Sequence, residues 1–239
     1  MQKTQVNFGA AVIAAILSIA CSPANSATRT DSSAPAAQQN PTASNTAATP
    51  PDPIVQAADR GRIDGDSTAK TWVIIASDFQ CPFCKEWHDV TYKPFIDQYV
   101  RTGKVKVAYI NFPLESIHKN AVITAEAAMC ASSQNKFWQY HEALFSSQAL
   151  WAGMPDPRPV LDSLAKAVGV DVAAWGKCVD SKQMLPLINA DRDRAAAAGV
   201  GSTPSFLIGD QVLAGAQPLD DMRPAIEAAI AKSGSAPAR

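Results

Sequence analysis

The sequence predicts a mixed α/β domain that is interrupted by a run of helices, and three observations support this fold class. First, the apolar run Thr71–Ser77 leads into a turn around Cys81 and Cys84 and then into an amphipathic stretch, the pattern of strand, turn and helix. Second, the strand expected at Lys104–Phe112 is followed by about five helical stretches. Third, a strand hairpin and a final helix close the chain.

The start of the chain has the features of an export signal. Residues 1–20 contain a lysine near the start and then an apolar core that is too short to span a bilayer permanently. The segment Leu17–Cys21 resembles the bacterial lipobox, in which the cysteine becomes lipidated and then forms the mature N-terminus. We therefore expect residues 1–21 to be a signal peptide with a lipobox and Cys21 to anchor the protein to a membrane. Ordinary cleavage a few residues later is the alternative.

Residues 22–60 consist mostly of Ala, Ser, Thr, Pro, Asn and Gln. A segment with so few large apolar side chains cannot bury enough surface to offset the entropy of ordering it. We expect a disordered tether with a reach of roughly 30 Å. Within this region, Ile54–Ile63 is expected to form a short helix or strand that leads into turns at Gly61 and Gly65. Since only Ile54–Lys70 remains before the first strand, no dimerisation domain is expected and the protein should be a monomer.

The central strand and helix follow from the hydrophobic pattern. Thr71–Ser77 is continuously apolar, as expected for a strand in the middle of a sheet that is covered on both faces. The helix that begins at Pro82 should run to about Val100, with Gly103 just after its end. Pro94 lies inside this helix and predicts a kink.

The remaining elements are predicted in the same way. Lys104–Phe112 alternates apolar and polar residues and reads as a strand ended by Pro113. Helices are expected over Asn120–Ser132, Asn135–Ser146, about Val160–Val168, about Val172–Val179 with Asp171 as N-cap, and about Met184–Ala198. The hairpin consists of Ser205–Ile208 and Gln211–Leu213, and the last helix spans about Leu219–Ala231.

The motif Cys81-Pro82-Phe83-Cys84 is the part of the sequence with the clearest chemistry. Pro82 falls at the first helical position, where its missing N–H costs nothing. Cys81 therefore lies where unpaired backbone N–H groups and the positive end of the helix dipole converge, and both favour thiolate over thiol. Two cysteines at this spacing close a small disulfide ring with little backbone movement. We interpret the pair as redox-active.

Two other interpretations of the motif are open. Cys81, Cys84 and His88 form a C-x2-C-x3-H cluster that offers three metal ligands, although no second cysteine or histidine pair nearby completes a tetrahedron. A structural disulfide is the other interpretation, and the strand-to-helix context argues against it. Covalent haem attachment is excluded because Lys85 stands where a histidine is required.

Charge and the remaining polar residues give weaker signals. The formal net charge is −1 and no run of Lys or Arg occurs, so we exclude nucleic-acid binding. We expect His88 to be a partly exposed surface residue, and His118 and His141 to be packed in the helical region. Asp78 and Glu86 are expected to be solvated flanking charges. No cofactor and no bound metal are expected.

Four motifs taken jointly make the sequence resemble the DsbA-like branch of the thioredoxin superfamily, the exported thiol:disulfide oxidoreductases of bacteria. The resemblance covers nearly all of Ala69–Lys232. The motifs are Asp78–Cys84, Phe112–Leu114 followed by His118, Ala128–Ala131 with Lys136–Trp138, and Gly199–Phe206.

This resemblance implies a thioredoxin fold made of residues 61–112 and 199–234, with an inserted helical domain at residues 113–198. It also implies that the Thr203-Pro204 bond is cis and lies against the two sulfurs, where the Thr203 backbone binds an extended substrate peptide like an added strand. Cys130 and Cys178 are expected to form a structural disulfide, as such pairs do in related proteins. The alternative is two unpaired core cysteines.

The resemblance further implies that the protein exchanges disulfides with protein thiols through Cys81 and Cys84, as a dithiol oxidase that a membrane redox partner resets. A reductase or isomerase, or a metal-binding or copper-delivery module, is the alternative. Phe83 replaces the histidine of strong oxidants, so we expect the pKa of Cys81 to lie between about 3.5 and about 8.5. The expected location is the periplasmic side of a bacterial membrane, lipid-anchored through Cys21, or soluble in the periplasm if the lipobox is not used.

Overall fold

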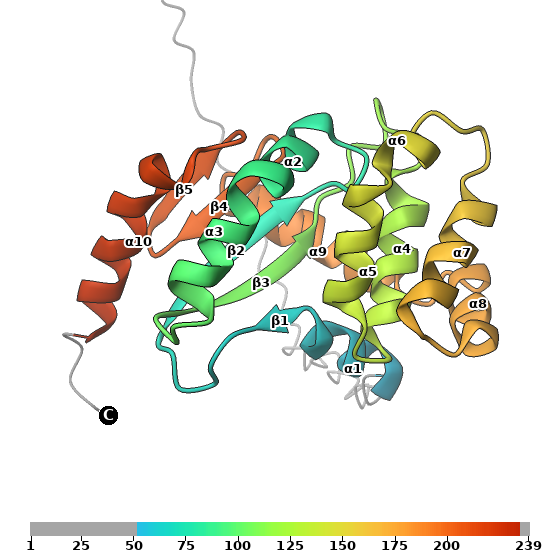
Figure 1. Ribbon diagram of the computed structural model, residues 1–239, viewed down its shortest axis with the longest axis horizontal. Helices are drawn as coiled ribbons and strands as arrows, with labels where there is room; N and C mark the ends of the chain where they lie inside the picture. The colour runs from blue at the N-terminus through green and yellow to red at the C-terminus, as the bar shows by residue number, and fades with distance from the viewer. Residues whose placement is uncertain (1–51, 235–239) are drawn as a thin grey trace, which may run out of the picture. The chain divides into compact units, whose positions relative to one another are not determined.

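The computed structural model describes residues 52–234, which belong to one compact unit built on a five-stranded mixed sheet (Figure 1). The predicted signal peptide, its Cys21 and most of the predicted tether lie outside these residues. The spatial order of the strands is β1-β3-β2-β4-β5; β2 and β3 run parallel, and the other neighbours are antiparallel. The strands are β1 (Ile63–Asp64), β2 (Thr71–Ser77), β3 (Val105–Asn111), β4 (Ser205–Ile208) and β5 (Gln211–Ala214).

Twelve helical elements surround this sheet in the described residues. In chain order they are α1 (Pro53–Gly61), α2 (Pro82–Trp87), the π-helical η1 (His88–Tyr92), α3 (Lys93–Phe95), the π-helical η2 (Ile96–Val100), α4 (Ala121–Ser132), α5 (Phe137–Ser146), α6 (Gln148–Trp151), α7 (Arg158–Val168), α8 (Val172–Asp180), α9 (Leu185–Ala197) and α10 (Leu219–Gly234). None of the helices within residues 52–234 is both long and apolar enough to cross a membrane.

β2 lies at the centre of the sheet, between β3 and β4, as its continuous apolar run predicted. It pairs in register with β3 up to Ser77, which lies opposite Asn111. Both strands therefore end at the same edge of the sheet. The loop that leads to Cys81 and the loop that follows β3 meet at this edge.

Helices cover both faces of the sheet (Figure 1). The helix from α2 to η2 packs on one face together with α10, and Trp87 of α2 contacts Phe206 of β4 there. α9 packs against β3 on the other face, where Ala195 joins a second small core with Phe112 and Ala76. The helices α4 to α8 group to one side of the sheet.

The helix that begins at Pro82 continues to Val100, as predicted, although a proline lies in its interior. Pro94 has no N–H to donate to the carbonyl of Val90, four residues earlier. The helix widens into the π-helical turn η1 just before this position and into η2 shortly after it. The helical turns therefore adapt around Pro94, and the helix does not end there.

α6 is a short helix that the hydrophobic pattern did not predict. It follows α5 directly and is four residues long. The Trp151 indole N–H donates to the Leu144 carbonyl at 3.0 Å, and the Trp151 ring is fully buried. This anchor holds α6 against α5 and brings Gln148 to the loop that precedes Cys81.

Residues 53–60 lie in the predicted tether but fold as part of α1, so the C-terminal end of the predicted tether is wrong and the short element expected at Ile54–Ile63 is a helix. The Asp52 carboxylate caps this helix by accepting from Ile54 N at 2.8 Å. Ala58 is buried against α4, where Ser132 Oγ donates to the Ala58 carbonyl at 2.6 Å. The average composition of the tether region concealed a short amphipathic segment that α4 stabilises.

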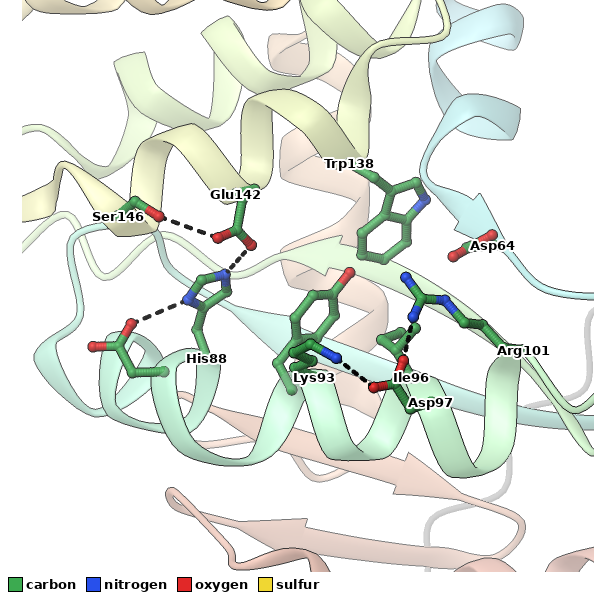
Figure 2. Close-up of a pocket in the computed structure, with 11 residues that line it drawn as sticks. Asp64, His88, Lys93, Ile96, Asp97, Arg101, Trp138, Glu142 and Ser146 are labelled. Atoms are coloured by element: carbon green, nitrogen blue, oxygen red, sulfur yellow. Dashed lines mark hydrogen bonds and ion pairs between the residues drawn. The ribbon is translucent and has the colours of Figure 1, made fainter.

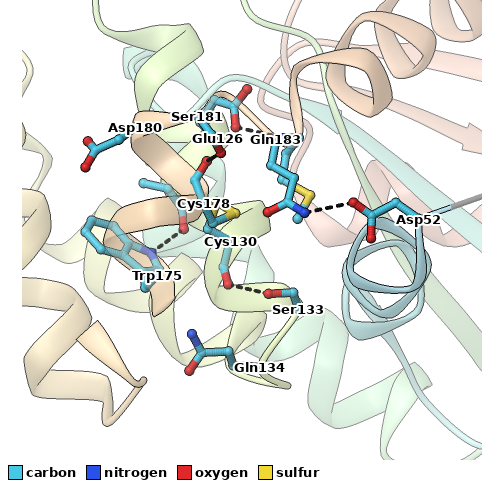
Figure 3. The surroundings of a disulfide bond; sticks show 12 residues. Asp52, Glu126, Cys130, Ser133, Gln134, Trp175, Cys178, Asp180, Ser181 and Gln183 are labelled. Carbon is cyan, nitrogen blue, oxygen red and sulfur yellow. Dashed lines mark hydrogen bonds between the residues drawn. A yellow bond between two sulfur atoms is a disulfide. The ribbon is translucent and has the colours of Figure 1, made fainter. Parts of the chain in front are cut away.

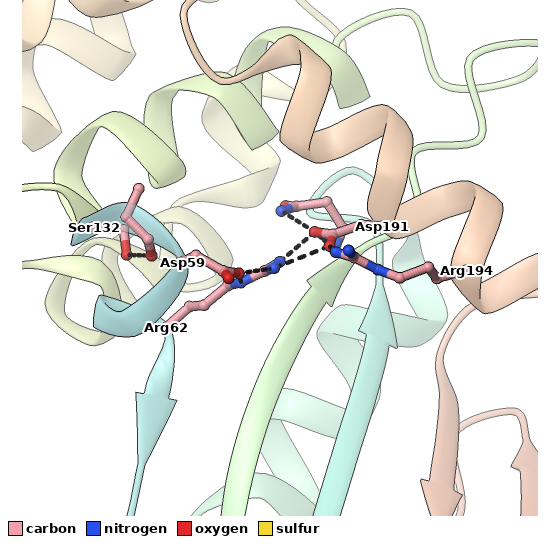
Figure 4. Close-up of polar contacts among 7 residues, drawn as sticks. Asp59, Arg62, Ser132, Asp191 and Arg194 are labelled. Atoms are coloured by element: carbon pink, nitrogen blue, oxygen red, sulfur yellow. Dashed lines mark hydrogen bonds and ion pairs between the residues drawn. The ribbon is translucent and has the colours of Figure 1, made fainter. Parts of the chain in front are cut away.

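A buried ion pair fixes this N-terminal segment to the sheet (Figure 4). Arg62 lies directly after α1 and pairs with Asp191 of α9, with Nη2 2.9 Å from Oδ1. Asp191 also accepts from Asn111 N at 3.1 Å and from Arg194 Nη2 at 2.8 Å. Asp59 pairs with the same Arg62 guanidinium. These partners satisfy both buried charges, which is necessary because an unpaired buried charge is strongly destabilising.

The position of α9 shows that the helical insert ends earlier than the predicted residue 198. The resemblance placed residues 113–198 in the insert, but α9 packs against β3 and contributes Ala195 to the core on that face of the sheet. The helices that lie beside the sheet are α4 to α8. We therefore place the end of the insert before α9.

Candidate active site

The loop after β2 and the first turn of α2 carry Cys81 and Cys84. Cys81 is the N-cap residue of α2, with φ −67° and ψ 125°, and Pro82 begins the helix as predicted. Lys85 N donates to the Cys81 carbonyl at 3.2 Å and closes the first helical turn. The free N–H groups of that turn therefore point toward the Cys81 side chain.

Both sulfurs are buried thiols. Cys81 is 3% exposed and Cys84 is 1% exposed, and neither takes part in a disulfide. Cys81 Sγ lies 3.4 Å from the Thr203 carbonyl oxygen, to which it donates when it is protonated. This contact brings the loop before β4 onto the cysteine pair.

The two thiols have opposite pKa shifts. The hydrogen bond from Cys84 lowers the pKa of Cys81 to about 6, and the backbone N–H groups of Cys84 and Phe83 act in the same direction, against the effect of burial. Burial raises the pKa of Cys84 well above its usual range, and the Cys81 sulfur raises it further. At neutral pH, Cys81 is therefore a thiolate and Cys84 keeps its proton. The pKa of Cys81 lies between the two limits expected from the sequence.

The Thr203-Pro204 peptide bond is cis. Both residues are buried and lead directly into β4. Gly215 N, just after β5, donates to the Pro204 carbonyl at 2.8 Å, so the hairpin supports this loop. The structure thus brings Cys81, Cys84 and the Thr203-Pro204 loop together, although they are far apart in the sequence.

Asp78 is a buried part of this site, and the expectation that it is a solvated flanking charge is wrong. Its carboxylate accepts from Gln80 N at 2.8 Å and from Leu114 N at 2.9 Å, and it lies 2.7 Å from His118 Nδ1. These contacts tie the loop before Cys81 to the loop after β3. Asp78 and His118 stand in separate motifs of the sequence, and only the pairing of β2 with β3 brings them together.

Two amide side chains near the cysteine pair, those of Gln80 and Gln148, have roles that no signal in the sequence predicts. Gln80 Oε1 accepts from Asn120 N at 2.7 Å. Gln148 Nε2 donates to the Phe79 carbonyl at 2.7 Å and to the Cys81 carbonyl at 3.1 Å. A single buried glutamine or asparagine has no periodicity that would mark it in a sequence.

His88 is buried, so the expectation of a partly exposed residue is wrong. Its Nε2 atom lies 2.8 Å from Glu142 Oε2 and its Nδ1 atom lies 3.2 Å from Asp89 Oδ1, at the side of a cavity of about 560 Å³ (Figure 2). Residues 52–234 contain no group of three or more His, Cys, Asp or Glu side chains placed to hold a metal. The residues of the C-x2-C-x3-H cluster are therefore not arranged as a metal site.

His141 is packed in the helical region, as expected. It is fully surrounded by aromatic rings that include Phe79, Tyr109 and Trp138. Burial lowers the pKa of His141 well below its usual range, and the neighbouring His88 lowers it further. His141 is therefore neutral at physiological pH, and its contact with Phe79 supports the loop before Cys81.

Cys130 of α4 and Cys178 of α8 form a disulfide, with a Cα–Cα distance of 5.9 Å (Figure 3). Trp175 is fully buried nearby and donates its indole N–H to the Ala127 carbonyl at 2.9 Å. The disulfide and this hydrogen bond both join α8 to α4. This second cysteine pair therefore acts within the helical insert and is separate from Cys81 and Cys84.

A family model described as thioredoxin matches residues 57–228 of this chain. The matched range contains all five strands, the Cys81–Cys84 motif and the Thr203-Pro204 loop. The chain belongs to the thioredoxin family. The N-terminus of α2 and the loop before β4 thus both lie within the range that the family model matches.

Proteins named for disulfide formation are among the relatives of this thioredoxin-family chain. It is 28% identical over 172 residues to the "Probable disulfide bond formation protein D" of Bacillus anthracis, over 70% of this chain and 77% of that protein. It is 21% identical over 170 residues to the disulfide bond formation protein D of Bacillus subtilis, over 68% of this chain and 74% of that protein. A match to a Na⁺/H⁺ antiporter of Salinispora tropica covers only 26% of that protein, so that similarity concerns one part of it.

Two solved structures have a similar fold. Oxidised BdbD from Bacillus subtilis has a TM-score of 0.65 and 21% identity, over 72% of this chain and 94% of BdbD. The alpha-DsbA1 protein of Wolbachia pipientis has a TM-score of 0.63 and 21% identity, over 72% of this chain and 92% of that protein. The thioredoxin fold with a helical insert and the resemblance to the DsbA-like branch are therefore confirmed.

Proposed function

We propose that this protein is a thiol:disulfide oxidoreductase of exported proteins, with Cys81 as the sulfur that substrates attack and Cys84 as its partner. The opposite pKa shifts of the two thiols carry this proposal. A stabilised thiolate next to a thiol that keeps its proton is the arrangement that dithiol–disulfide exchange requires. Membership of the thioredoxin family and the similarity to a protein named for disulfide bond formation support the same reaction class.

In the oxidising direction, the protein starts with a disulfide between Cys81 and Cys84. A substrate thiolate attacks the Cys81 sulfur, the protein disulfide breaks, and the Cys84 sulfur leaves and takes up a proton. A second substrate thiolate then attacks the substrate sulfur of the mixed disulfide, and Cys81 leaves as a thiolate. The substrate loses two electrons and its two thiol protons. The protein takes up both electrons, Cys84 takes up one proton, and the other proton is released to solvent while Cys81 stays a thiolate.

The Thr203-Pro204 loop is proposed to hold the substrate during this exchange. The Thr203 carbonyl lies 3.4 Å from Cys81 Sγ, so the backbone of this loop borders the sulfur that a substrate must reach. A peptide that pairs with the Thr203 backbone as an added strand would present its own cysteine to Cys81.

Oxidation of substrate dithiols is the direction that we propose. A lower pKa makes Cys81 a better leaving group and stabilises the reduced protein, which makes the disulfide form more oxidising. The names of the two Bacillus relatives, which refer to disulfide bond formation, support this direction. A membrane redox partner must then remove two electrons and restore the disulfide. Phe83, which offers no imidazolium, favours the second candidate, a reductase or isomerase.

The proposed location is the periplasmic side of a bacterial membrane. The export signal and the lipobox at Cys21 support attachment through an N-terminal lipid, and cleavage without lipidation would give a soluble periplasmic protein. The disulfide between Cys130 and Cys178 also supports an oxidising compartment, where such bonds persist. We propose a monomer.

The reduction potential of the Cys81–Cys84 couple, measured in glutathione buffers, tests the direction. An oxidase should lie well above thioredoxin's roughly −270 mV and toward the roughly −120 mV of DsbA. Mixing the oxidised protein with a reduced dithiol peptide tests the reaction itself. Cys81→Ser should abolish the exchange. The reduced Cys84→Ser variant, mixed instead with the disulfide form of the peptide, should accumulate a mixed disulfide, because its Cys81 thiolate attacks the peptide disulfide and releases one peptide thiol. Exchange that survives Cys81→Ser would exclude the proposed function, and a potential near that of thioredoxin would favour a reductase.

A further inference from the structure

One buried side chain of the helical insert donates hydrogen bonds to the backbone of the loop before Cys81. Gln148, the first residue of α6, is 7% exposed. Its Nε2 atom donates to the Phe79 carbonyl at 2.7 Å and to the Cys81 carbonyl at 3.1 Å. A single amide group therefore holds the two carbonyls on either side of Gln80.

Neighbouring contacts fix the position of Gln148. Trp151, three residues later, is fully buried and donates to the Leu144 carbonyl at 3.0 Å, which holds α6 on α5. Gln80 Nε2 donates to the Ala152 carbonyl at 2.7 Å, which ties the end of α6 to the same loop. The amide of Gln148 is thus supported by packing and by a second hydrogen bond between the same two segments.

We propose that Gln148 is a positioning residue for Cys81, through which the helical insert sets the reactivity of the cysteine pair. This inference rests on the proposed role of Cys81 in disulfide exchange. The Cys81 carbonyl accepts from Lys85 N within the first turn of α2, and Gln148 provides a second donor to the same oxygen from the insert. The Cys81 peptide is therefore held from two independent parts of the fold.

The Gln148 amide stabilises the Cys81 thiolate in two ways. It fixes the Cys81 peptide, so that the N–H groups of Phe83 and Cys84 stay directed at the sulfur. It also offsets the partial negative charge of the Cys81 carbonyl, which would otherwise oppose a thiolate on the same residue. Loss of the amide donor should therefore make the thiolate less stable.

Two substitutions of Gln148 test this inference. Gln148→Met keeps an unbranched side chain of similar length and removes the donor. Gln148→Glu is nearly isosteric and places a carboxyl oxygen against the two carbonyls. Gln134→Leu is a matched control, because Gln134 also makes two side-chain-to-backbone hydrogen bonds in the insert, both to Asp171, at 2.7 Å and 3.2 Å.

The measurements are the ultraviolet absorbance of the thiolate against pH and the equilibrium of the Cys81–Cys84 couple with glutathione. We expect Gln148→Met to raise the pKa of Cys81 by about 0.5 to 1 unit, from the usual worth of one hydrogen bond, and Gln148→Glu to raise it further. Both variants should shift the glutathione equilibrium toward the protein disulfide, and Gln134→Leu should change neither quantity.

The outcomes separate this inference from the proposed function. If the wild-type couple does not exchange with glutathione, the proposed function fails. If the wild-type couple exchanges normally and both Gln148 variants keep the wild-type pKa and equilibrium, only this inference fails. A loss of stability alone, measured by urea unfolding, would show a structural role and would also overturn it.

Discussion

The two cysteine pairs of this protein are both buried but lie in different surroundings. Cys81 and Cys84 lie at a helix N-terminus, where N–H donors converge, and they are thiols. Cys130 and Cys178 lie inside α4 and near the end of α8, and they are joined as a disulfide. Burial alone therefore does not decide how reactive a cysteine is in this fold. The hydrogen-bond donors that reach the Cys81 sulfur distinguish it from the other buried cysteines.

The surroundings of the second pair disfavour charge. Glu126 lies one helical turn before Cys130 and is 2% exposed. Its Oε2 atom accepts from Met184 N at 3.1 Å, yet burial raises the pKa of Glu126 to about 7. A thiolate in this region would meet the same desolvation penalty. The second pair therefore suits a structural role.

Removal of the second pair should have the largest effect on stability. The disulfide spans 48 residues, and a loop of that length is worth about 4 kcal/mol in the chain-entropy model. Cys130→Ala combined with Cys178→Ala should therefore lower the free energy of unfolding by about 4 kcal/mol, measured in urea. Exchange through Cys81 should continue below the unfolding transition. A parallel loss of exchange in the folded variant would contradict the separation of the two pairs.

Alkylation of the reduced protein should distinguish the two thiols of the first pair. Near pH 7, Cys81 should react with iodoacetamide at least about a hundredfold faster than Cys84, because only Cys81 is mostly thiolate. The Cys81 rate should fall as the pH drops through about 6, where its thiolate takes up a proton. Mass spectrometry of the labelled peptides measures both rates, with Cys81→Ser as the control. Equal rates would remove the distinction between the two sulfurs.

The same pKa shifts predict how the stability of the reduced protein depends on pH. The pKa of Cys81 is lowered from 9.0 to about 6, so ionisation of Cys81 stabilises the folded protein. This stabilisation is complete above about pH 9 and is lost as the pH falls to about 6. The raised pKa of Cys84 has the opposite sign and weakens the fold only above the ordinary pKa of 9.0. Urea unfolding under reducing conditions should therefore show stability rising between about pH 6 and pH 9 relative to Cys81→Ser.

Substitution of Glu126 should give the smallest of these effects. Its pKa is raised from 4.5 to about 7, so ionisation of the unfolded chain destabilises the fold as the pH rises between these values. Glu126→Gln should stabilise the protein by about 2 kcal/mol near pH 8 and by almost nothing near pH 4. Urea unfolding at both pH values is the measurement. A gain of equal size at both would show that ionisation of Glu126 is not the cause.

The order of helices and strands could be predicted because hydrophobic periodicity and helix-capping residues are visible in short stretches of sequence. Thr71–Ser77 has the bounds of β2, and the Asp171 carboxylate caps α8 by accepting from Ala173 N at 2.9 Å, as expected. α6 could not be predicted, and α1 only as a short helix or strand over Ile54–Ile63, since both are short and depend on contacts with distant segments. The Ala58 carbonyl of α1 accepts a hydrogen bond from Ser132 of α4, and the Trp151 indole of α6 donates to the Leu144 carbonyl near the end of α5.

The site was predictable only where a residue pattern marks it. The helix start at Pro82 placed Cys81 correctly, and the position of the Thr203-Pro204 loop came from the family resemblance. The burial of Asp78 and the two hydrogen bonds of Gln148 had no local signal. They arise from the parallel pairing of two strands and from a helix that the sequence did not reveal.

The attachment of α1 at one border of the sheet has a mechanical consequence. Tension applied to the chain ahead of Asp52 enters the fold through α1 and the edge strand β1, which β3 separates from β2. That load falls first on the hydrogen bond between Ser132 and Ala58, and then on the Arg62–Asp191 pair and the pairing of β1 with β3. A molecule pulled by the chain ahead of Asp52 would thus be deformed at the edge of the sheet before β2, the strand that leads to Cys81, is disturbed.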